Sequence, residues 1–226
     1  MLRPDLRTRR RGHFAVRSIG GFVLLLVFIG LRMWARSERR DRQNSGHGAN
    51  SRPNPDAVAN AALEQAAIAF EQGRFPDSIN HASAAISSSP NNFDAYVIRS
   101  AAYRRSGNLE AALADATKAA SLRGSDTEMP MFRASILMEM KRFADAENDF
   151  TRTINMSATN AGAYLGRAEA RIEQGKLDPA AEDMKKAFTL APPGWDEMDY
   201  AKGVQKKLEA AQAAKAAGNA EAPPGK

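Results

Sequence analysis

The chain has 226 residues, a formal net charge of +6 and no cysteine, which excludes disulfide-stabilised folds and cysteine nucleophiles. Residues 1–56 contain 12 Arg and 4 acidic residues, a net of +8, whereas residues 57–226 contain 20 basic and 22 acidic residues, a net of −2. The larger part of the chain therefore lacks the basic excess that is typical of nucleic-acid-binding domains, and we expect no nucleic-acid partner.

The chain begins with a basic tail, residues 1–13, followed by an apolar segment, residues 14–35. The uninterrupted apolar stretch, Ile19 to Leu31, is too short to cross a bilayer, but the whole segment reaches the roughly 20 residues that a spanning helix needs. Arg17 and Arg32 would then extend their charged ends toward the two interfaces. The segment therefore predicts a transmembrane helix.

Two other interpretations of this segment compete with a membrane anchor. A buried helix of a soluble domain is disfavoured by the Arg-rich flanks and by the polar residues that follow. A cleaved signal peptide fits the basic start, but Arg32 and Trp34 follow the apolar stretch without a small-x-small cleavage site nearby. We therefore favour an uncleaved signal anchor.

The charges around the segment favour one orientation only slightly. Six Arg precede the apolar stretch and five follow it closely, which tilts the positive-inside rule toward a cytoplasmic N-terminus. We expect a single-pass protein of a bacterial inner membrane with the rest of the chain in the periplasm. Residues 36–56 are rich in Gly, Ser, Asn, Pro and charge, which predicts a disordered linker.

After the linker, a period of about 34 residues occurs four times without an insertion or deletion. The repeated positions are Gly73, Gly107, Lys141 and Gly175; Phe75, Leu109, Phe143 and Leu177; Ser78, Ala112, Ala146 and Ala180; and Ala85, Ala119, Thr153 and Ala187. The repeats run over residues 59–92, 93–126, 127–160 and 161–194, within a domain of residues 57–194. A fixed period in this range predicts an array of stacked repeats, and such arrays commonly bind other chains.

Each repeat reads as two helices of about 13 residues joined by a tight turn. In the second repeat they are expected near residues 95–106 and 110–122. Gly107 stands where the turn is expected to need a positive φ, and Lys141 in the equivalent place would be strained by about 1 kcal/mol. Small residues at Ala66, Ser100, Ala134 and Ala168 are expected to face Ser78, Ala112, Ala146 and Ala180, which lets the two helices approach closely.

A charged pair recurs inside the repeats. Arg99, Arg133 and Arg167 share one repeat position, and Asp115, Asp149 and Asp183 share another, at a constant spacing further along the chain. We expect each Arg to meet its Asp across the helical hairpin, although a chance match on two solvated faces is the alternative. Such pairs would support hairpin geometry rather than catalysis.

The stretches Ala95 to Leu122, AYVIRSAAYRRSGNLEAALADATKAASL, and Ala163 to Pro192, AYLGRAEARIEQGKLDPAAEDMKKAFTLAP, resemble tetratricopeptide repeats. The resemblance covers residues 59–194 as four units in register. It implies an all-α fold: an α-solenoid of four helical hairpins plus a C-terminal capping helix, here preceded by one transmembrane helix and a flexible linker. It also implies protein binding as the function.

In arrays of this kind the first helices line a concave groove. The residues at the groove positions are Leu63, Ala67, Phe70, Val97, Ala101, Arg104, Arg105, Met131, Ser135, Met138, Leu165, Glu169 and Ile172. Some relatives clamp a terminal carboxylate with Lys and Asn, but those positions here hold Leu63, Ala67, Ile98, Glu128 and Phe132. We therefore expect an apolar or amphipathic polypeptide partner with an acidic group near Arg104 or Arg105. Several of these residues have packing between repeats as their alternative role.

An apolar stripe follows the last repeat. Trp195, Met198, Ala201, Val204 and Leu208 recur at helical spacing, which predicts a capping helix over residues 195–215 that covers the fourth repeat. Residues 216–226 are expected to form a disordered tail.

No pattern in the sequence points to catalysis, a cofactor or a metal. The three histidines, His13, His47 and His81, are scattered over three regions, and the sequence lacks phosphate-binding and nucleophile motifs. We expect a membrane-anchored scaffold for protein–protein interaction in envelope assembly or quality control, and no enzyme. The alternatives are an exported soluble binding protein, a structural subunit that makes its contacts through the transmembrane helix, and the regulatory piece of a separate enzyme.

Overall fold

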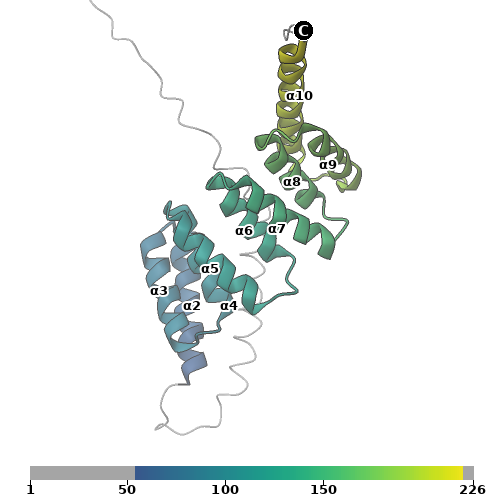
Figure 1. Ribbon diagram of the computed structural model, residues 1–226. Helices are drawn as coiled ribbons and strands as arrows, with labels where there is room; N and C mark the ends of the chain where they lie inside the picture. The colour runs from purple at the N-terminus through teal and green to yellow at the C-terminus, as the bar shows by residue number, and fades with distance from the viewer. Residues whose placement is uncertain (1–53, 221–226) are drawn as a thin grey trace, which may run out of the picture.

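The computed structural model describes residues 54–220, with side chains to residue 217, and this region is entirely α-helical. Its helices, shown in Figure 1, are α2 (Pro55–Glu71), α3 (Phe75–Ser88), α4 (Phe93–Arg105), α5 (Leu109–Leu122), α6 (Glu128–Glu139), α7 (Phe143–Met156), α8 (Ala161–Glu173), α9 (Leu177–Leu190) and α10 (Met198–Ala220). The prediction of an all-α solenoid is confirmed.

The predicted tail, anchor and most of the linker, residues 1–13, 14–35 and 36–53, lie outside the described residues, as do residues 221–226. Within residues 54–220, no helix combines the length and the apolarity that crossing a bilayer requires. The predicted transmembrane helix is therefore not part of the structure described.

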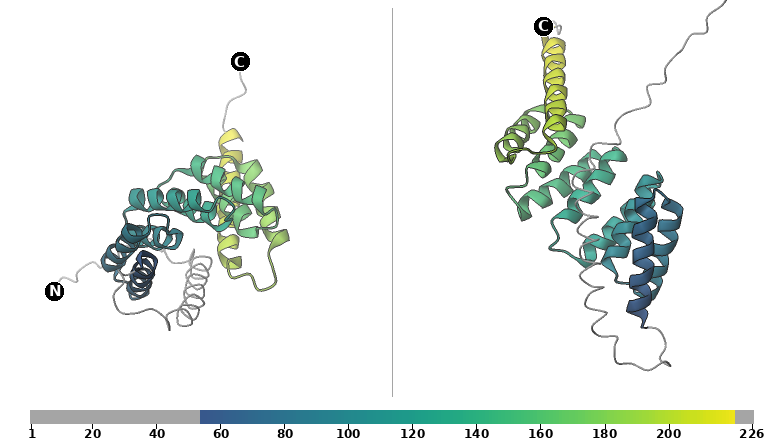
Figure 2. Two further views of the ribbon diagram at one scale, coloured as in Figure 1. Left: turned by 90° about the horizontal axis from the view of Figure 1, so that it is seen from below. Right: turned by 180° about the vertical axis from the view of Figure 1, so that it is seen from behind.

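The helices pair as hairpins, α2 with α3, α4 with α5, α6 with α7 and α8 with α9, and the hairpins stack in chain order along a curved path (Figure 2). The first helices of neighbouring repeats also touch, since α2 packs against α4 and α6 against α8. The first helices consequently form the inner side of the array, and α3, α5, α7 and α9 form the outer side.

The turns inside the hairpins share one backbone conformation. Gly73, Gly107 and Gly175 have φ values of 72°, 82° and 74°, in the left-handed region that costs glycine little. Lys141 adopts the same conformation, with φ 59°, without the glycine that suits it. The predicted positive φ is therefore confirmed, and the strain expected at Lys141 stays a prediction.

Asparagine side chains cap several helices and set where they begin. The Oδ1 atoms of Asn92, Asn108 and Asn160 each accept a hydrogen bond from the backbone N–H three residues later, at distances of 2.9–3.1 Å. Each bond satisfies an N–H group that the first turn of a helix leaves unpaired. Helix α2 starts at Pro55, inside the predicted linker, because Asn54 caps it and proline suits the first helical turn. The asparagine caps in the sequence therefore fix the residues at which these helices begin.

The close approach of the two helices in a hairpin depends on small residues. The eight predicted facing positions are all fully buried. In the first repeat Ser78 Oγ donates to the carbonyl oxygen of Ala66 at 2.8 Å, and in the second Ser100 Oγ donates to that of Ala112 at 2.6 Å. The serine lies on the second helix in the first repeat and on the first helix in the second repeat, but the two helices cross at the same repeat positions in both.

The last helix starts and ends later than the predicted range of 195–215. Ala201, Val204 and Leu208 of α10 are buried against the apolar residues of α8 and α9. The helix begins at Met198, continues to Ala220 and extends beyond the array in Figure 1. Its last residues are rich in alanine, the residue with the highest helix propensity, which explains the extra turn.

Candidate functional site

The predicted Arg–Asp pairs are present in all three repeats. Each Nε donates to an Asp Oδ2, at 2.7 Å for Arg99 and Asp115, 2.6 Å for Arg133 and Asp149, and 2.9 Å for Arg167 and Asp183. An Nη2–Oδ1 bond completes a bidentate pair in each case, and all three carboxylates are buried. These pairs hold the two helices of a hairpin together and belong to the framework rather than to a reactive site.

Two of these arginines also reach the preceding repeat. Arg99 Nη1 donates to Ser83 Oγ at 3.1 Å, and Arg167 Nη1 donates to Thr151 Oγ1 at 3.2 Å. Thr117 occupies the equivalent position before Arg133, but within the described residues that pair makes no hydrogen bond. These links were not predicted, although a hydroxyl residue stands at a constant spacing before each Arg in the sequence.

The structure places six of the predicted groove residues in the packed interior, which revises their role. Leu63, Phe70, Val97, Ala101, Leu165 and Ile172 are all buried within the apolar clusters of the array. Their side chains are therefore committed to packing between helices, the alternative that the sequence left open.

The predicted positive spot is engaged by contacts within the chain. Arg104 is only 15% exposed, and its Nε and Nη2 donate to Glu139 Oε1 at 2.7 and 2.5 Å, which links α4 to α6. The exposed Arg105 places its guanidinium 5.3 Å from the ring centroid of Phe75 on α3. An acidic group of a partner would have to compete with these contacts.

The capping helix occupies the C-terminal end of the inner side. Tyr200 donates its hydroxyl hydrogen to Glu169, another predicted groove residue, and Lys207 pairs with Glu173. Burial, together with the nearby Glu169 carboxylate, raises the pKa of the Tyr200 phenol, and burial also raises the pKa of Glu197 beside α8. Glu169 is therefore used to hold α10 in place.

The accessible part of the inner side lies mainly on α6. Met131, Ser135 and Met138 are half-buried and recur at i, i+4 and i+7, so they form one stripe along this helix. Asn160 lies beside the stripe, with its Nδ2 3.3 Å from Met131 Sδ. We call Met131, Ser135 and Met138 the α6 stripe. Of the remaining predicted residues, Ala67 is half-buried on α2.

A polar pocket of about 490 Å³ opens between the start of α2, the α3–α4 loop and the end of α5. Its lining residues are Asp56, Ala59, Asn60, Ser89, Asn91, Asn92, Phe93, Asp94, Leu122 and Arg123. Arg123 stacks 3.8 Å from the ring centroid of Phe93 and lies 3.9 Å from the Asp94 carboxylate. In the part of the chain that the structure describes, no cluster of His, Cys, Asp and Glu is suited to hold a metal ion.

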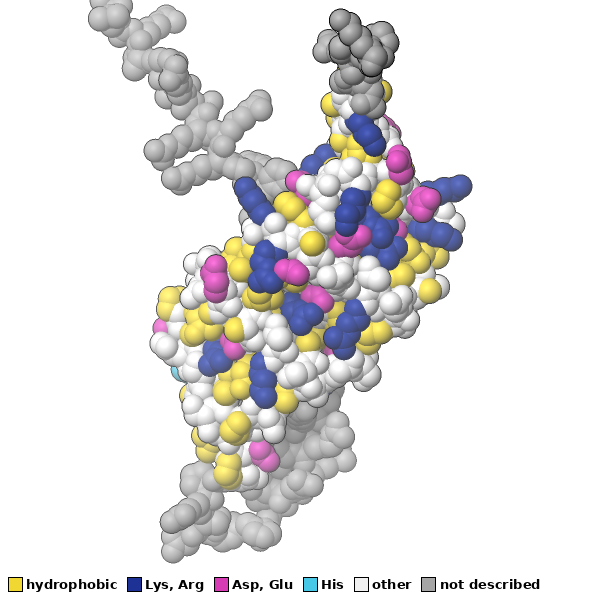
Figure 3. Space-filling view, in the orientation of Figure 1, with side chains coloured by type: hydrophobic (Ala, Val, Ile, Leu, Met, Phe, Trp, Pro, Cys, Tyr) yellow, Lys and Arg dark blue, Asp and Glu magenta, His cyan; other side chains and the backbone are white. Residues whose placement is uncertain are grey.

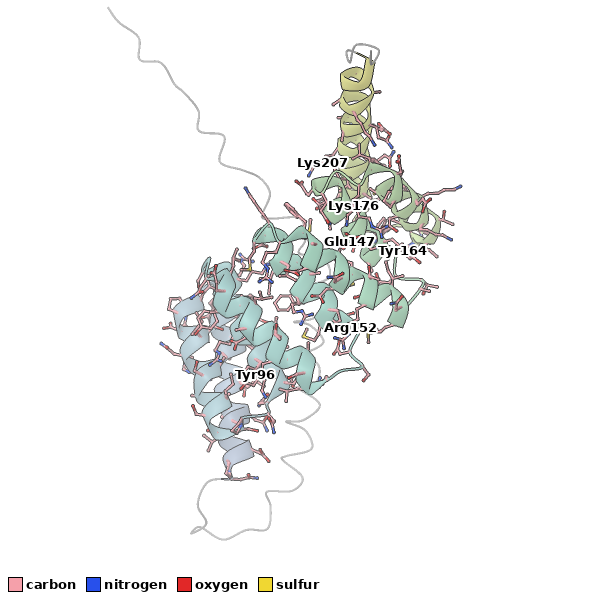
Figure 4. The ribbon with its side chains drawn as sticks, in the orientation of Figure 1. Tyr96, Glu147, Arg152, Tyr164, Lys176 and Lys207 are labelled. Atoms are coloured by element: carbon pink, nitrogen blue, oxygen red, sulfur yellow. The ribbon has the colours of Figure 1, made fainter. Side chains whose placement is uncertain are left out.

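A charged network joins the third and fourth repeats. Glu147 on α7 accepts hydrogen bonds from Arg171, Gln174 and Lys176, at 2.8, 2.9 and 2.8 Å; Figure 4 labels Glu147 and Lys176. Burial alone would raise the pKa of Glu147, but these three donors outweigh it and lower the pKa to about 2. Arg171 also donates to Asp183 at 2.8 Å, so the network continues into the Arg–Asp pair of the fourth repeat.

A repeat array with this turn, helix pairing and buried small-residue contact matches a known family model. The model described as Tetratricopeptide repeat matches residues 58–126 and 133–194, which is more than half of the chain. The chain belongs to the tetratricopeptide repeat family. Neither the family nor the described side chains give any positive sign of catalysis, and tetratricopeptide repeat (TPR) domains are typical of protein-interaction scaffolds.

Two curated relatives show how far the likeness extends. The chain is 29% identical over 106 residues to RNA polymerase II-associated protein 3 of Mus musculus, covering 47% of this chain and 16% of the relative. It is 26% identical over 153 residues to DnaJ homolog subfamily C member 3 of Rattus norvegicus, covering 68% and 28%. The chain thus spans less than a third of the length of these TPR relatives.

Solved TPR structures share the fold. A structure of MamA protein has a TM-score of 0.57 at 18% identity, covering 75% of this chain and 98% of the other. A tetratricopeptide repeat protein from Parabacteroides merdae has a TM-score of 0.62 at 19% identity, covering 69% and 60%. At these identities the likeness concerns the fold alone.

Proposed function

We propose that the protein is a membrane-anchored TPR scaffold that binds a polypeptide segment along the inner side of its array. The observation that carries the proposal is the α6 stripe, because it leaves two flexible methionines and one hydroxyl partly accessible on a helix of the inner side. Methionine adapts its shape to varied apolar partners. An apolar or amphipathic segment, bound as a helix or as an extended strand, fits such a stripe.

The anchor in this proposal is the apolar segment of residues 14–35. Its length, its Arg flanks and Trp34 at its C-terminal end support a single transmembrane helix. The array would then be held near a bilayer, and we propose a role in envelope assembly or quality control, with the array in a bacterial periplasm. An exported protein after signal cleavage and a subunit that makes its contacts through the transmembrane helix are the competing proposals.

Site-specific crosslinking tests the inner side as the binding site. A photo-crosslinking residue at Ser135, within the α6 stripe, should capture a polypeptide in native membranes, whereas the same residue at Asn148, exposed on the outer helix α7, should not capture it. Both positions are polar, so neither replacement removes a core side chain. Capture at Asn148 but not at Ser135 would move the binding site to the outer side.

Substitution of the stripe gives a second test. Ser135→Arg with Met138→Glu should abolish recovery of that polypeptide while the helical content stays unchanged, because both side chains are partly solvated. The matched control, Ala114→Arg with Asn148→Glu, places the same charges on exposed outer positions and should leave recovery intact. A stripe variant that folds and still recovers the partner would refute the site.

Two measurements test the anchor separately. The full chain should stay with membranes in alkaline carbonate, since a spanning helix is not released by salt or pH. Mass spectrometry of the mature N-terminus should show residues 14–35 still present. Loss of these residues from the mature chain would instead support the exported form.

A further inference from the structure

The basic residues of the array fall into two groups. Most are neutralised by partners within the chain, as in the Arg–Asp pairs and in the contacts of Arg171 and Lys176 with Glu147. In contrast, the ammonium groups of Lys118, Lys185 and Lys186 make no hydrogen bond or ion pair within the described residues, and the same holds for the charged groups of Lys141 and Arg105, which lie at the turn ends of their hairpins. Arg152 donates only to the carbonyl oxygen of Gly124, at 3.3 Å, in the same part of the chain.

Lys118, Arg152, Lys185 and Lys186 lie along one face of the outer helices. Lys118, Arg152 and Lys186 are each separated by one full repeat, so they occupy the same position on the outer helices α5, α7 and α9, and all are exposed. Lys185 is exposed beside Lys186. We call Lys118, Arg152, Lys185 and Lys186 the outer basic row. Figure 3 shows Lys and Arg side chains spread over the face that carries α5 and α7, and Figure 4 labels Arg152 there.

In each of the three repeats that contribute to the row, an apolar side chain lies next to the basic one. Leu122, Met156 and Leu190 follow Lys118, Arg152 and Lys186 by one helical turn on the same face. Met156 is 36% exposed, and the two leucines are half-buried, with Leu122 also packed in part against the apolar core. The first repeat lacks both features, since Ala84 and Ser88 occupy these positions. A basic residue paired with an apolar one in three successive repeats is a recurring amphipathic unit.

The surroundings of the row carry little opposing charge. One turn before the basic position stand Ala114, Asn148 and Glu182, of which only Glu182 is acidic. That carboxylate lies in the repeat with two lysines, so each of the three repeats retains a net positive charge on this face. The aromatic residue nearest to the row in sequence on α9, Phe188, is half-buried against the apolar core of α8 to α10, so it is not an open platform for stacking on nucleic-acid bases.

We propose that the outer basic row, with Leu122, Met156 and Leu190, docks the array on the surface of an anionic lipid bilayer. Lys and Arg would contact the phosphate headgroups, and the adjacent apolar side chains would enter the boundary between headgroups and acyl chains. Charge complementarity favours an anionic surface, and the apolar neighbours favour a bilayer over a hydrated polyanion. The inner side would then face away from the membrane and stay open to a polypeptide.

This inference rests on the proposed anchor, which makes a weak contact sufficient. If the predicted linker is flexible, the 18 residues 36–53 that precede α2 would have a root-mean-square length of about 23 Å, which would hold the start of the array near the bilayer on average. Tethering raises the effective concentration of the second contact. Four charges that would hardly recruit a free protein can therefore orient a tethered one, within the roughly 10 Å reach of electrostatics at 0.1 M salt.

Fluorescence quenching on the full chain tests the orientation. The protein has no cysteine, so Asn148→Cys provides a single labelling site on the outer face. The labelled chain is reconstituted into vesicles of phosphatidylcholine alone or mixed with phosphatidylglycerol, each with a trace of lipid carrying a quencher on its headgroup. Quenching should be strong only with phosphatidylglycerol and should fall at high salt. Equal quenching in both vesicles would overturn the proposal.

Charge reversal identifies the residues responsible. Lys118→Glu, Arg152→Glu and Lys186→Glu together should shift the equilibrium between docked and undocked arrays at least about tenfold toward undocked. The matched control reverses the exposed lysines Lys202, Lys206 and Lys215 on α10 and should leave quenching unchanged. Unchanged quenching in the first variant would refute the row.

Two further readouts separate the possible failures. Polypeptide capture at Ser135 should persist in the row variant, because the row lies on the opposite side from the α6 stripe; its loss would contradict the separation of the two surfaces. Release of the chain by alkaline carbonate would refute the anchor, whereas flotation of that released chain with phosphatidylglycerol vesicles would still support the row. Row-dependent binding to a short RNA, without any effect of vesicle composition, would overturn the proposal in favour of a polyanion.

Discussion

The junction between the third and fourth repeats adds a charged network to its apolar contacts, whereas the same positions at the junction between the first and second repeats are apolar or aromatic. Glu147 and Arg171 meet across the later junction, and the equivalent positions in the earlier one are Ile79 and Tyr103, which pack against the apolar core. The backbone arrangement is the same in both places. The repeat fold therefore fixes where two residues meet but leaves open the chemistry of their contact.

The same contrast appears in volume. At the first two junctions the outer helix contributes an alanine and the following inner helix contributes a large side chain; the pairs are Ala82 with Ile98 and Ala116 with Phe132. At the last junction the order is reversed, because Phe150 lies against Gly166. At each junction one side chain of the pair is large and the other is small, but the large one lies on the inner helix at the first two junctions and on the outer helix at the last. A close-packed interior tolerates such an exchange because the combined volume of the pair stays limited.

Removal of the Asp183 carboxylate, which two arginines of the fourth repeat share, should give the largest loss of stability. Asp183 accepts hydrogen bonds from both Arg167 and Arg171, whereas Asp115 accepts from Arg99 alone among the described residues. Asp183→Asn should lower the free energy of unfolding by about 3 kcal/mol, because the partly buried guanidinium group of Arg167 loses its counter-charge and that of Arg171 keeps only Glu147. Asp115→Asn should cost less, about 2 kcal/mol. Urea unfolding followed by circular dichroism measures both, and equal losses would deny the special role of Arg171.

A methyl group at the last junction tests the volume exchange. Gly166→Ala would place a Cβ atom 2.4 Å from the Phe150 ring, so the ring or helix α8 must shift, at a cost of about 2 kcal/mol. Gly203→Ala on α10 is the control, since nothing lies within 4 Å of its Cβ position among the described residues, and it should be neutral or stabilising by up to about 1 kcal/mol. Urea midpoints that move equally for the two variants would show that Phe150 yields without strain.

Acid should weaken the charged junction before the apolar one. The folded-state pKa of Glu147 is lowered to about 2, so its contribution is complete above the ordinary glutamate pKa and is lost as the pH falls through roughly 4.5 toward 2. Glu147→Gln should cost about 1 kcal/mol at pH 7 and flatten the acid dependence of the melting temperature. Glu182→Gln, on an exposed surface, is the control. A wild-type acid profile in the Glu147→Gln variant would contradict this role.

The smallest effect should come from the turn of the third repeat. Lys141 has a left-handed φ of 59° where the other three hairpins have glycine. Lys141→Gly should stabilise the protein by up to about 1 kcal/mol, because glycine adopts this conformation without strain. The reverse change, Gly107→Lys, should destabilise by a similar amount. Melting temperatures that fail to move in opposite directions would show that the turn stores no strain.

Much of the fold could be read from the spacing of residues. The turn conformation at Gly107 and Lys141, the facing small residues and the three Arg–Asp pairs all follow from fixed separations along the chain. A constant separation across a hairpin of known helix length leaves little freedom, so Arg99 and Asp115 meet whatever their neighbours are. The likeness to TPR sequences supplied the stacking of the hairpins into a solenoid, which spacing alone does not define.

The candidate site was less predictable, because position on a helix does not determine accessibility. Val97 and Met131 occupy the same repeat position, yet Val97 is fully buried and Met131 is half-buried. Likewise, the sequence predicts Arg104 as a cation available to a partner, but in the structure it is paired with Glu139 of the next repeat. Burial and pairing of this kind depend on the volumes and charges of residues in other repeats.

The sequence by itself determined the repeat period, the hairpins with their turns and caps, and the pairing inside each repeat, since these depend on local propensity and on fixed spacing. Only the tertiary structure decided which inner side chains remain accessible, that α10 uses Glu169, and that Phe150 fills the space left by Gly166. Those outcomes depend on how neighbouring repeats and the capping helix pack. Packing is collective: one side chain is buried only when others, far away in the chain, close over it.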